Sequence, residues 1–233
     1  MKRFYKDVAT HQVDGGWQVT LDKRGIKTVK GAQQILPTRA LAEAMAQEWD
    51  AQGEKLDPTT LPMRDMADYA LDIVAPDVAA IAETLTAFGD TDTLLYRADP
   101  DEPLYARQQE VWEPIVAEFE QREGVRLTPV SGIMHRPQSA DTLTSLRAKL
   151  ETSDPFTLAG IEAMTSLSAS LVVGLSALEP DIEPLTLWEA ASLEEEWQAD
   201  LWGRDAEAET RRAKREGDFL KACEFTRLAR LPS

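Results

Sequence analysis

The sequence has 233 residues, of which 43% are hydrophobic and 28% charged; these ordinary proportions exclude wholesale disorder. The net charge is −16, but it is unevenly spread: residues 1–31 carry seven Lys or Arg against three Asp or Glu, which is +4. The other 202 residues carry 18 against 38, which is −20. Such an acidic body repels phosphate backbones, so no nucleic-acid partner is expected. The charge suits either a basic protein partner or plain solubility.

Cysteine content and hydropathy point to a reducing compartment. The single cysteine, Cys223, excludes an internal disulfide and is expected to be a small packing residue. Lys2 and Arg3 are not followed by the apolar run of a secretory signal. The longest stretch without a charge, residues 163–178, holds five Ser or Thr and is too short to span a bilayer. We therefore expect a cytoplasmic protein with no membrane insertion.

The first 30 residues predict β-strands. Residues 4–8 lead to a turn signal at Gly15-Gly16, and residues 17–21 alternate apolar and polar side chains. A second turn at residues 22–25 precedes a return strand at 26–29. Two hairpins of this size make a small antiparallel sheet, one face of which needs a cover.

The cover is predicted to be a helix over residues 39–52. Leu41, Met45 and Trp49 recur at steps of four and form one apolar stripe that fits a sheet. Residues 56–62 contain two prolines and are the best linker candidate. We therefore predict an N-terminal domain over residues 1–60 and a C-terminal domain over residues 61–233.

Beyond Pro62 the chain is predicted to be helical, apart from a loop or short strand at 128–136. Residues 155–178 are the most apolar segment and are expected to form the buried central helix of a bundle. The fold class is thus α+β, with a small N-terminal antiparallel sheet under a covering helix and an all-helical C-terminal domain. The predicted helices of that domain are 63–74, 76–88, 104–123, 142–150, 155–178, 184–202 and 205–230.

Residue types that carry catalysis are scarce. The two histidines, His11 and His135, stand far from Cys223 in sequence, so no zinc set or Cys–His pair can be written and no metal site is predicted. Asp90-Thr91-Asp92-Thr93 has the spacing of aspartate-nucleophile phosphatases, which need the first Asp at the tip of a buried strand. Here a helix pattern ends at Gly89, so helix capping is the favoured interpretation.

An acidic segment with embedded tryptophans is the most unusual feature. Between residues 189 and 209 eight acids face Arg204 alone, and Trp188, Trp197 and Trp202 lie in or beside this segment. A solvated helical face is one interpretation, and the tryptophans are equally well explained as core residues. Aromatic rings beside charge also resemble a protein-contact surface. The acids are Glu189, Glu194, Glu195, Glu196, Asp200, Asp205, Glu207 and Glu209.

Several motifs stand in a fixed order along the chain. They are Arg3-Phe4-Tyr5-Lys6, Gly16-Trp17-x-Val19-x-Leu21-Asp22, Leu36-Pro37, Glu48-Trp49-Asp50-Ala51-Gln52, Asp90-Thr91-Asp92-x-Leu94-Leu95-Tyr96-Arg97-Ala98, Arg107-Gln108-x-x-x-Trp112-x-Pro114 and Glu194-Glu195-Glu196-Trp197-Gln198 with Trp202-Gly203. Together they resemble one family, the assembly chaperone of the F1 sector of ATP synthase whose mitochondrial members act on the alpha subunit. The similarity runs from residue 3 to about 225, with small departures such as Lys23 in place of a usual Gly.

The resemblance implies an α+β domain followed by helices, and a chaperone that binds the free F1 alpha subunit until beta replaces it. It implies no cofactor and no enzymatic activity, and we expect a monomer. The expected partner-binding residues are Glu194, Glu195, Glu196, Trp197 and Trp202. On a helix, Glu194 shares a face with residue 198 and Glu195 with residue 202, so Glu196 points elsewhere. Glu195 or Glu196 is the favoured contact, since Glu194 could simply lead the helix.

Two other functions remain open from the residues alone. The acids of residues 189–209 could work with His135 in a carboxylate-based hydrolase. The chain could also be a generic helical adaptor protein unrelated to ATP synthase. Loss of a metal- or pH-dependent activity in His135→Ala would favour the enzyme.

Overall fold

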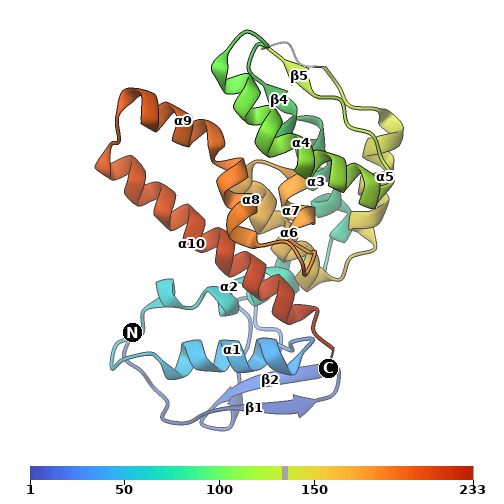
Figure 1. The fold of residues 1–233 in the computed structure, drawn as a ribbon. Coiled ribbons are helices and arrows are strands. Elements are labelled where there is room, and N and C mark those ends of the chain that lie inside the picture. Colours follow the sequence, from blue (N-terminus) through green and yellow to red (C-terminus); the bar gives the residue numbers. More distant parts are fainter. Residues whose placement is uncertain (133–135, 233) are drawn as a thin grey trace. The chain divides into compact units, whose positions relative to one another are not determined.

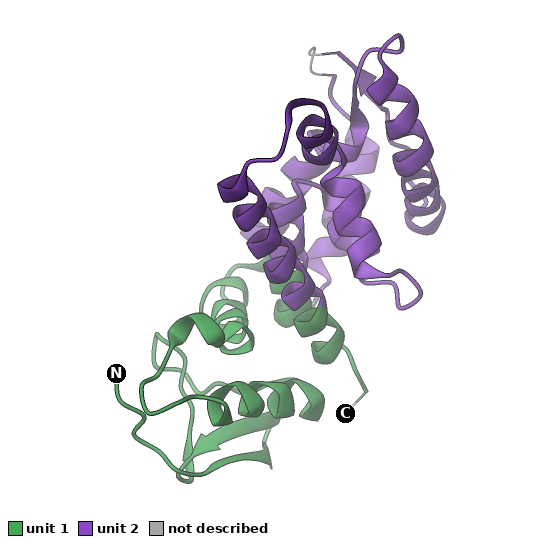
Figure 2. Ribbon diagram, turned by 60° about the vertical axis from the view of Figure 1, so that its left-hand side comes forward, with its two compact units in different colours: residues 1–78, 154–160, 224–233 green, residues 79–153, 161–223 purple. Residues whose placement is uncertain are grey.

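The computed structural model describes residues 1–132 and 136–232 (Figure 1). The chain divides into two compact units, which Figure 2 colours separately. Unit 1 comprises residues 1–78, 154–160 and 224–233, and unit 2 comprises residues 79–153 and 161–223. The domain boundary predicted between residues 60 and 61 is a statement about which parts fold independently. The division into compact units does not test it, so it stays a prediction.

The sheet of unit 1 has three antiparallel strands in the order β1-β2-β3. They are β1 (Val8–Val13), β2 (Gly16–Leu21) and β3 (Arg24–Gly25), and Val13 pairs with Gly16 across the first turn. Gly16 has φ +152, and a Cβ there would collide with the carbonyl oxygen of Leu36. The turn therefore requires glycine at this position.

The first strand begins later than predicted. Residues 4–8 were expected to be extended, but β1 starts at Val8 because the preceding residues bind elsewhere. The Arg3 backbone N–H donates to the carbonyl oxygen of Glu54 (2.8 Å), and the Tyr5 hydroxyl donates to that of Trp49 (2.5 Å). The return strand was predicted at residues 26–29, but the strand that pairs with β2 is Arg24–Gly25, inside the predicted turn.

Helix α1 (Arg39–Asp50) carries the predicted stripe. Thr38 caps it, because its hydroxyl oxygen accepts from the Leu41 N–H (3.1 Å). Leu41, Met45 and Trp49 are all buried, which confirms the apolar pattern. Unit 1 also holds η1 (Pro58–Thr60), α2 (Pro62–Tyr69) and a π-helical turn, η2 (Ala70–Val74), so the helix predicted over 63–74 ends irregularly.

The remaining elements are mainly helices, as the predicted fold class requires. One short parallel pair, β4 with β5, accompanies them, and α4 continues through Pro114. The division between the units runs through α6 and α10. The elements are α3 (Val78–Asp90), η3 (Thr93–Leu95), β4 (Tyr96–Arg97), α4 (Pro103–Glu123), β5 (Val130–Ser131), α5 (Ala140–Glu151), α6 (Pro155–Ser168), α7 (Leu171–Ser176), α8 (Pro184–Ala191), α9 (Leu193–Trp202) and α10 (Ala206–Ala229).

The single central helix predicted over 155–178 is wrong. Helix α6 ends at Ser168, Ala169 has φ +51, and α7 begins at Leu171. The Ser170 hydroxyl oxygen caps α7 by accepting from the Val173 N–H (3.0 Å), and the same hydroxyl donates to the buried carboxylate of Asp92 (2.7 Å). A contact from a distant segment thus interrupts an apolar pattern that is continuous in sequence.

Asp92 is a capping residue, as predicted. Its carboxylate accepts from the Leu94 N–H (3.0 Å) at the start of η3, and Asp90 is the last residue of α3. Neither aspartate stands at the tip of a buried strand, so the phosphatase interpretation has no structural basis. No helix among residues 1–132 and 136–232 is long and apolar enough to cross a membrane.

A candidate partner-binding groove

The three tryptophans of the acidic segment differ in exposure. Trp188 is a core residue, 2% exposed, with its ring 5.5 Å from that of Phe219. Trp197 is half-buried. Trp202, at the end of α9, is 80% exposed, and the adjacent Leu201 is 60% exposed. Of these three tryptophans, the one at the end of α9 presents its ring to solvent, and such exposed apolar surface is typical of a binding site.

Helix α9 is positioned by two buried side chains of α4. The indole N–H of Trp112 donates to the carbonyl oxygen of Ala190 (2.7 Å) at the end of α8. The buried amide of Gln108 accepts from the Ala98 N–H (2.8 Å) and donates to the Glu194 carboxylate (2.6 Å). These bonds fix the first turn of α9 against the segment that follows β4.

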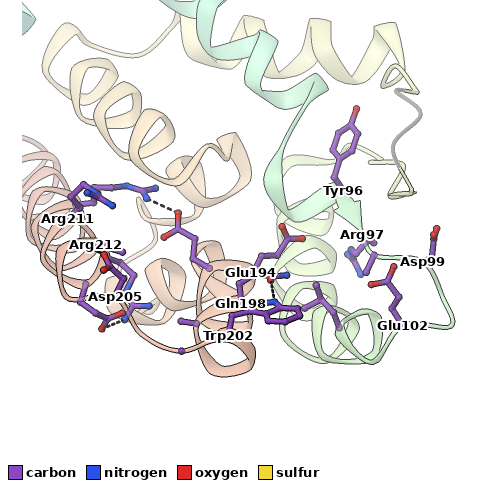
Figure 3. Close-up of a pocket in the computed structure, with 18 of the residues that line it drawn as sticks. Tyr96, Arg97, Asp99, Glu102, Glu194, Gln198, Trp202, Asp205, Arg211 and Arg212 are labelled. Atoms are coloured by element: carbon purple, nitrogen blue, oxygen red, sulfur yellow. Dashed lines mark hydrogen bonds and ion pairs between the residues drawn. The ribbon is translucent and has the colours of Figure 1, made fainter.

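A groove of about 1060 Å³ runs along α9 (Figure 3). One side is the segment from β4 to the start of α4, which includes Tyr96, Arg97 and Glu102. The other side is the first half of α10, which includes Arg211, Arg212 and Arg215. From α9 itself come Glu194, Glu195, Gln198, Ala199 and Trp202.

Glu194 is a positioning residue that also lines the groove. Burial raises the pKa of its carboxyl group, and the hydrogen bond from Gln108 opposes that shift. The carboxylate therefore accepts a charge-assisted bond in a partly desolvated place. Its contact with Gln108 explains why a glutamate stands at the first turn of α9.

Glu195 and Glu196 lie in different surroundings. The Glu195 carboxylate lines the groove and pairs with Arg215 (2.8 Å). Arg215 is held in turn, because it donates to the carbonyl oxygen of Leu167 (2.9 Å). Glu196 pairs with Arg204 (2.8 Å) and with Arg212, and it is not among the residues that line the groove.

The structure brings three of the five predicted site residues together. Glu194, Glu195 and Trp202 line the groove, whereas Glu196 and Trp197 do not. Trp202 keeps a defined orientation, since its indole N–H donates to the Gln198 side-chain oxygen (2.9 Å), which Figure 3 shows. Glu195 and Trp202 are seven residues apart, so they meet on one helical face.

Many acids of the acidic segment form ion pairs with arginines. In sequence it is bounded at residue 209 and contains Arg204 as its one cation, but further cations that pair with it follow on α10. Besides the pairs of Glu195 and Glu196, Arg204 pairs with Asp200 (2.8 Å), and Arg211 pairs with Glu207 (2.6 Å). The groove therefore combines acids from α9 with arginines from α10.

Sequence reasoning missed the groove residues outside α9. Gln108 and Arg97 lie in motifs of the family resemblance, but nothing local indicates that they meet α9. Arg211, Arg212 and Arg215 form a basic run in an amphipathic helix, a pattern that alone predicts only a solvated face.

The carboxylates that line the groove do not form a metal site with any other described residue. In the described part of the chain no three His, Cys, Asp or Glu side chains could hold a metal ion together. His135, which the hydrolase alternative requires, lies outside the described residues. Cys223 is buried with its sulfur 3.3 Å from that of Met164, and burial raises its pKa to about 12, so it is a packing residue as predicted.

An open groove with paired charges and an exposed tryptophan at one end has the features of a surface that contacts another protein. The family model described as ATP12 chaperone protein matches residues 2–120. The crystal structure of Atp12 from Paracoccus denitrificans is 37% identical, covers 98% of both chains and has a TM-score of 0.93. The Atu1473 protein of Agrobacterium tumefaciens is 36% identical over 97% of this chain and 85% of its own, with a TM-score of 0.91.

A curated relative shows the same likeness in sequence. Mitochondrial protein atp12 of Schizosaccharomyces pombe is 28% identical over 87% of this chain and 74% of its own. The chain therefore belongs to the ATP12 chaperone family. This is the family of ATP synthase assembly chaperones that the sequence motifs resemble, and both the family model and the Agrobacterium structure carry the name of a chaperone, not of an enzyme.

Proposed function

We propose that this chaperone binds the free alpha subunit of the F1 sector and shields its subunit interface until beta replaces it. Membership of the ATP12 family supports the proposal, and the observation that carries it is the exposed Trp202 beside the groove of unit 2. We place this role in the bacterial cytoplasm and expect a monomer, with the Paracoccus relative as support for a bacterial setting.

The physical reason for such a chaperone is the surface that an unassembled subunit exposes. A subunit interface is rich in apolar side chains and strand edges, which invite self-association. A groove of about 1060 Å³ can take one segment of that interface. Beta then displaces the chaperone by offering a larger complementary surface, and no nucleotide is needed for the exchange.

The five site residues have unequal roles in this proposal. Trp202, with Leu201 beside it, is the anchor, because rigid aromatic rings dominate the energy of protein contacts. Glu195 is the contact glutamate: its pair with Arg215 can open toward a cation of the partner. Glu194 holds α9 in place through Gln108, and Glu196 and Trp197 support α9 from outside the groove.

The first test measures the affinity of the purified alpha subunit for Trp202→Ala. We expect the dissociation constant to rise at least tenfold, which is about 1.4 kcal/mol, with an unchanged melting temperature because the ring is exposed. Leu185→Ala is the matched control, since Leu185 is exposed on α8 but does not line the groove. Equal affinity for Trp202→Ala and Leu185→Ala would move the contact away from this groove.

The second test compares three single changes that remove charge without changing size. Glu195→Gln should weaken binding of the alpha subunit by about 1–3 kcal/mol if the charge is desolvated there, with melting unchanged. Glu194→Gln should lower the melting temperature, because the Gln108 amide loses a charged acceptor. Glu196→Gln should change neither property much. If all three variants bind like the parent, the acidic segment is a solvated face.

A further inference from the structure

Unit 1 contains a second cavity, of about 530 Å³, that the groove on α9 does not explain. The N-terminal segment, the β2–β3 turn and the end of α1 line it. Its apolar lining includes Phe4, Ile26 and Trp49. The volume falls in the range of sites that hold a bound side chain or small ligand.

Three aromatic rings form a row that leads from solvent into this cavity wall. Phe4 is 62% exposed, and its ring stands edge-on to that of Tyr5 at 5.3 Å between centroids. Tyr5 stands edge-on to Trp49 at 5.8 Å, and its hydroxyl donates to the Trp49 carbonyl oxygen. The exposed ring is therefore supported by a rigid, buried base, which is how preorganised contact residues are held.

The cavity wall also contains an unsatisfied donor. Trp49 is only 8% exposed, and its indole nitrogen has no hydrogen-bond partner among the residues that the structure describes. A buried donor without an acceptor is unfavourable by about 1–3 kcal/mol. Because this nitrogen lies behind the cavity lining, its N–H group reports on rearrangement of the wall when a ligand binds.

The charges around the cavity are mainly positive. Arg24 and Lys27 are exposed lining residues, and the Arg64 guanidinium lies 5.9 Å from the centre of the Trp49 ring. Asp22 also lines the cavity, but its carboxylate accepts from the backbone N–H groups of Lys6 (2.9 Å) and Asp7 (3.0 Å). Those hydrogen bonds lower the Asp22 pKa, so this carboxylate stays charged, but Arg24, Lys27 and Arg64 outnumber it around the cavity.

We propose that this cavity docks an acidic segment of a partner protein that carries one large apolar side chain. The apolar side chain enters beside Phe4 and Trp49, and the carboxylates bind Arg24 and Lys27. Charge complementarity selects this occupant, because residues 1–31 carry +4 in a chain whose other residues carry −20. The same net charge of −16 disfavours an extended nucleic acid.

The experiment uses the full chain and a fluorescent heptapeptide with one central Phe flanked by three Glu on each side. Anisotropy should show saturable binding at low salt, and the Lys-for-Glu version of the peptide should not bind. In the ¹⁵N–¹H spectrum, the indole signal that Trp49→Phe removes should shift as the acidic peptide is added. That signal reports on occupation of the cavity beside the Trp49 side chain.

Two exposed changes test the rim without disturbing the core. Arg24→Glu with Lys27→Glu should raise the dissociation constant at least tenfold, and Phe4→Ala should do the same. The control, Arg39→Glu with Arg227→Glu, changes the charge equally at exposed unit 1 positions outside the cavity. Equal weakening by the control, no indole shift, or binding of an oligo-dT decamer in place of the peptide would each overturn the proposal. None of these outcomes involves the alpha subunit or the groove on α9.

Discussion

Asp92 joins two segments of unit 2 that are distant in sequence. It is fully buried, and its carboxylate accepts from the Leu94 N–H (3.0 Å), the Ser170 hydroxyl (2.7 Å) and the Val172 N–H (2.9 Å). One carboxylate thus caps both η3 and the start of α7. Burial raises its pKa to about 6 despite these donors, because desolvation of the charged form outweighs the hydrogen bonds.

Asp92→Ala should lower the free energy of unfolding by about 4 kcal/mol. In this variant three buried donors lose their acceptor, and each unsatisfied donor lowers the stability by about 1–3 kcal/mol. Asp92→Asn retains one acceptor oxygen and should cost about half as much. Urea denaturation at pH 7 measures both values, and the exposed Asp101→Asn, expected within about 0.5 kcal/mol of the parent, is the control.

The pH dependence separates the charge from the hydrogen bonds. Since the folded-state pKa is raised above the unfolded value of 3.8, the folded chain binds the proton more tightly, and this stabilisation fades as pH rises through about 6. The stability difference between the parent and Asp92→Asn should be larger at pH 5 than at pH 7 by about 1 kcal/mol. If the stability difference between the parent and Asp92→Asn is the same at pH 5 and pH 7, the buried charge is refuted. If Asp92→Ala has the same free energy of unfolding as the parent, the capping role is refuted.

Three further changes test other parts of the fold. Trp49→Arg should destabilise unit 1 by several kcal/mol, because it places a charge between Tyr5 and the sheet; an unchanged melting temperature would exclude Trp49 from the core. Ala169→Gly should raise the free energy of unfolding by about 0.5–1 kcal/mol, because the φ of +51 strains an L-residue. Urea denaturation measures this change, and a loss of stability would contradict the prediction. Association with the alpha subunit should slow as salt rises above about 0.15 M, and stopped-flow rates that stay flat would contradict electrostatic steering.

Local patterns predicted the elements whose causes are local. The stripe of α1 and the cap at Asp92 follow from spacing and side-chain chemistry over a few residues. The break at Ala169 could not be predicted in this way, because it depends on Asp92, 77 positions earlier in the chain. The late start of β1 has a similar cause, since residues 3–5 bind the end of α1 and the loop after it.

The candidate site shows the same limit in its electrostatics. The acidic segment ends at residue 209 and contains Arg204 alone, and the other arginines that pair with it begin two residues later, on α10. The pair between Glu195 and Arg215 joins two helices and spans 20 positions. A short window of sequence does not contain both residues, so a local pattern cannot predict the pair. Gln108 and Glu194, 86 positions apart, belong to separate motifs of the family resemblance. The motifs identified the residues, but only the structure relates them.

Paired charges in the groove bear on how a temporary binder could release its partner. When a partner cation replaces Arg215 at Glu195, one ion pair is exchanged for another, so the net electrostatic gain is small. Affinity in the proposed complex would then come mainly from burial of Trp202 and Leu201. The free energy gained from this burial is proportional to the apolar area removed from water. A subunit that covers a larger apolar area would therefore displace the chaperone. Glu195 would then pair with Arg215 again, so its carboxylate has a partner both before and after release. In the proposed complex, internal pairing would let the chaperone bind an interface and still release it.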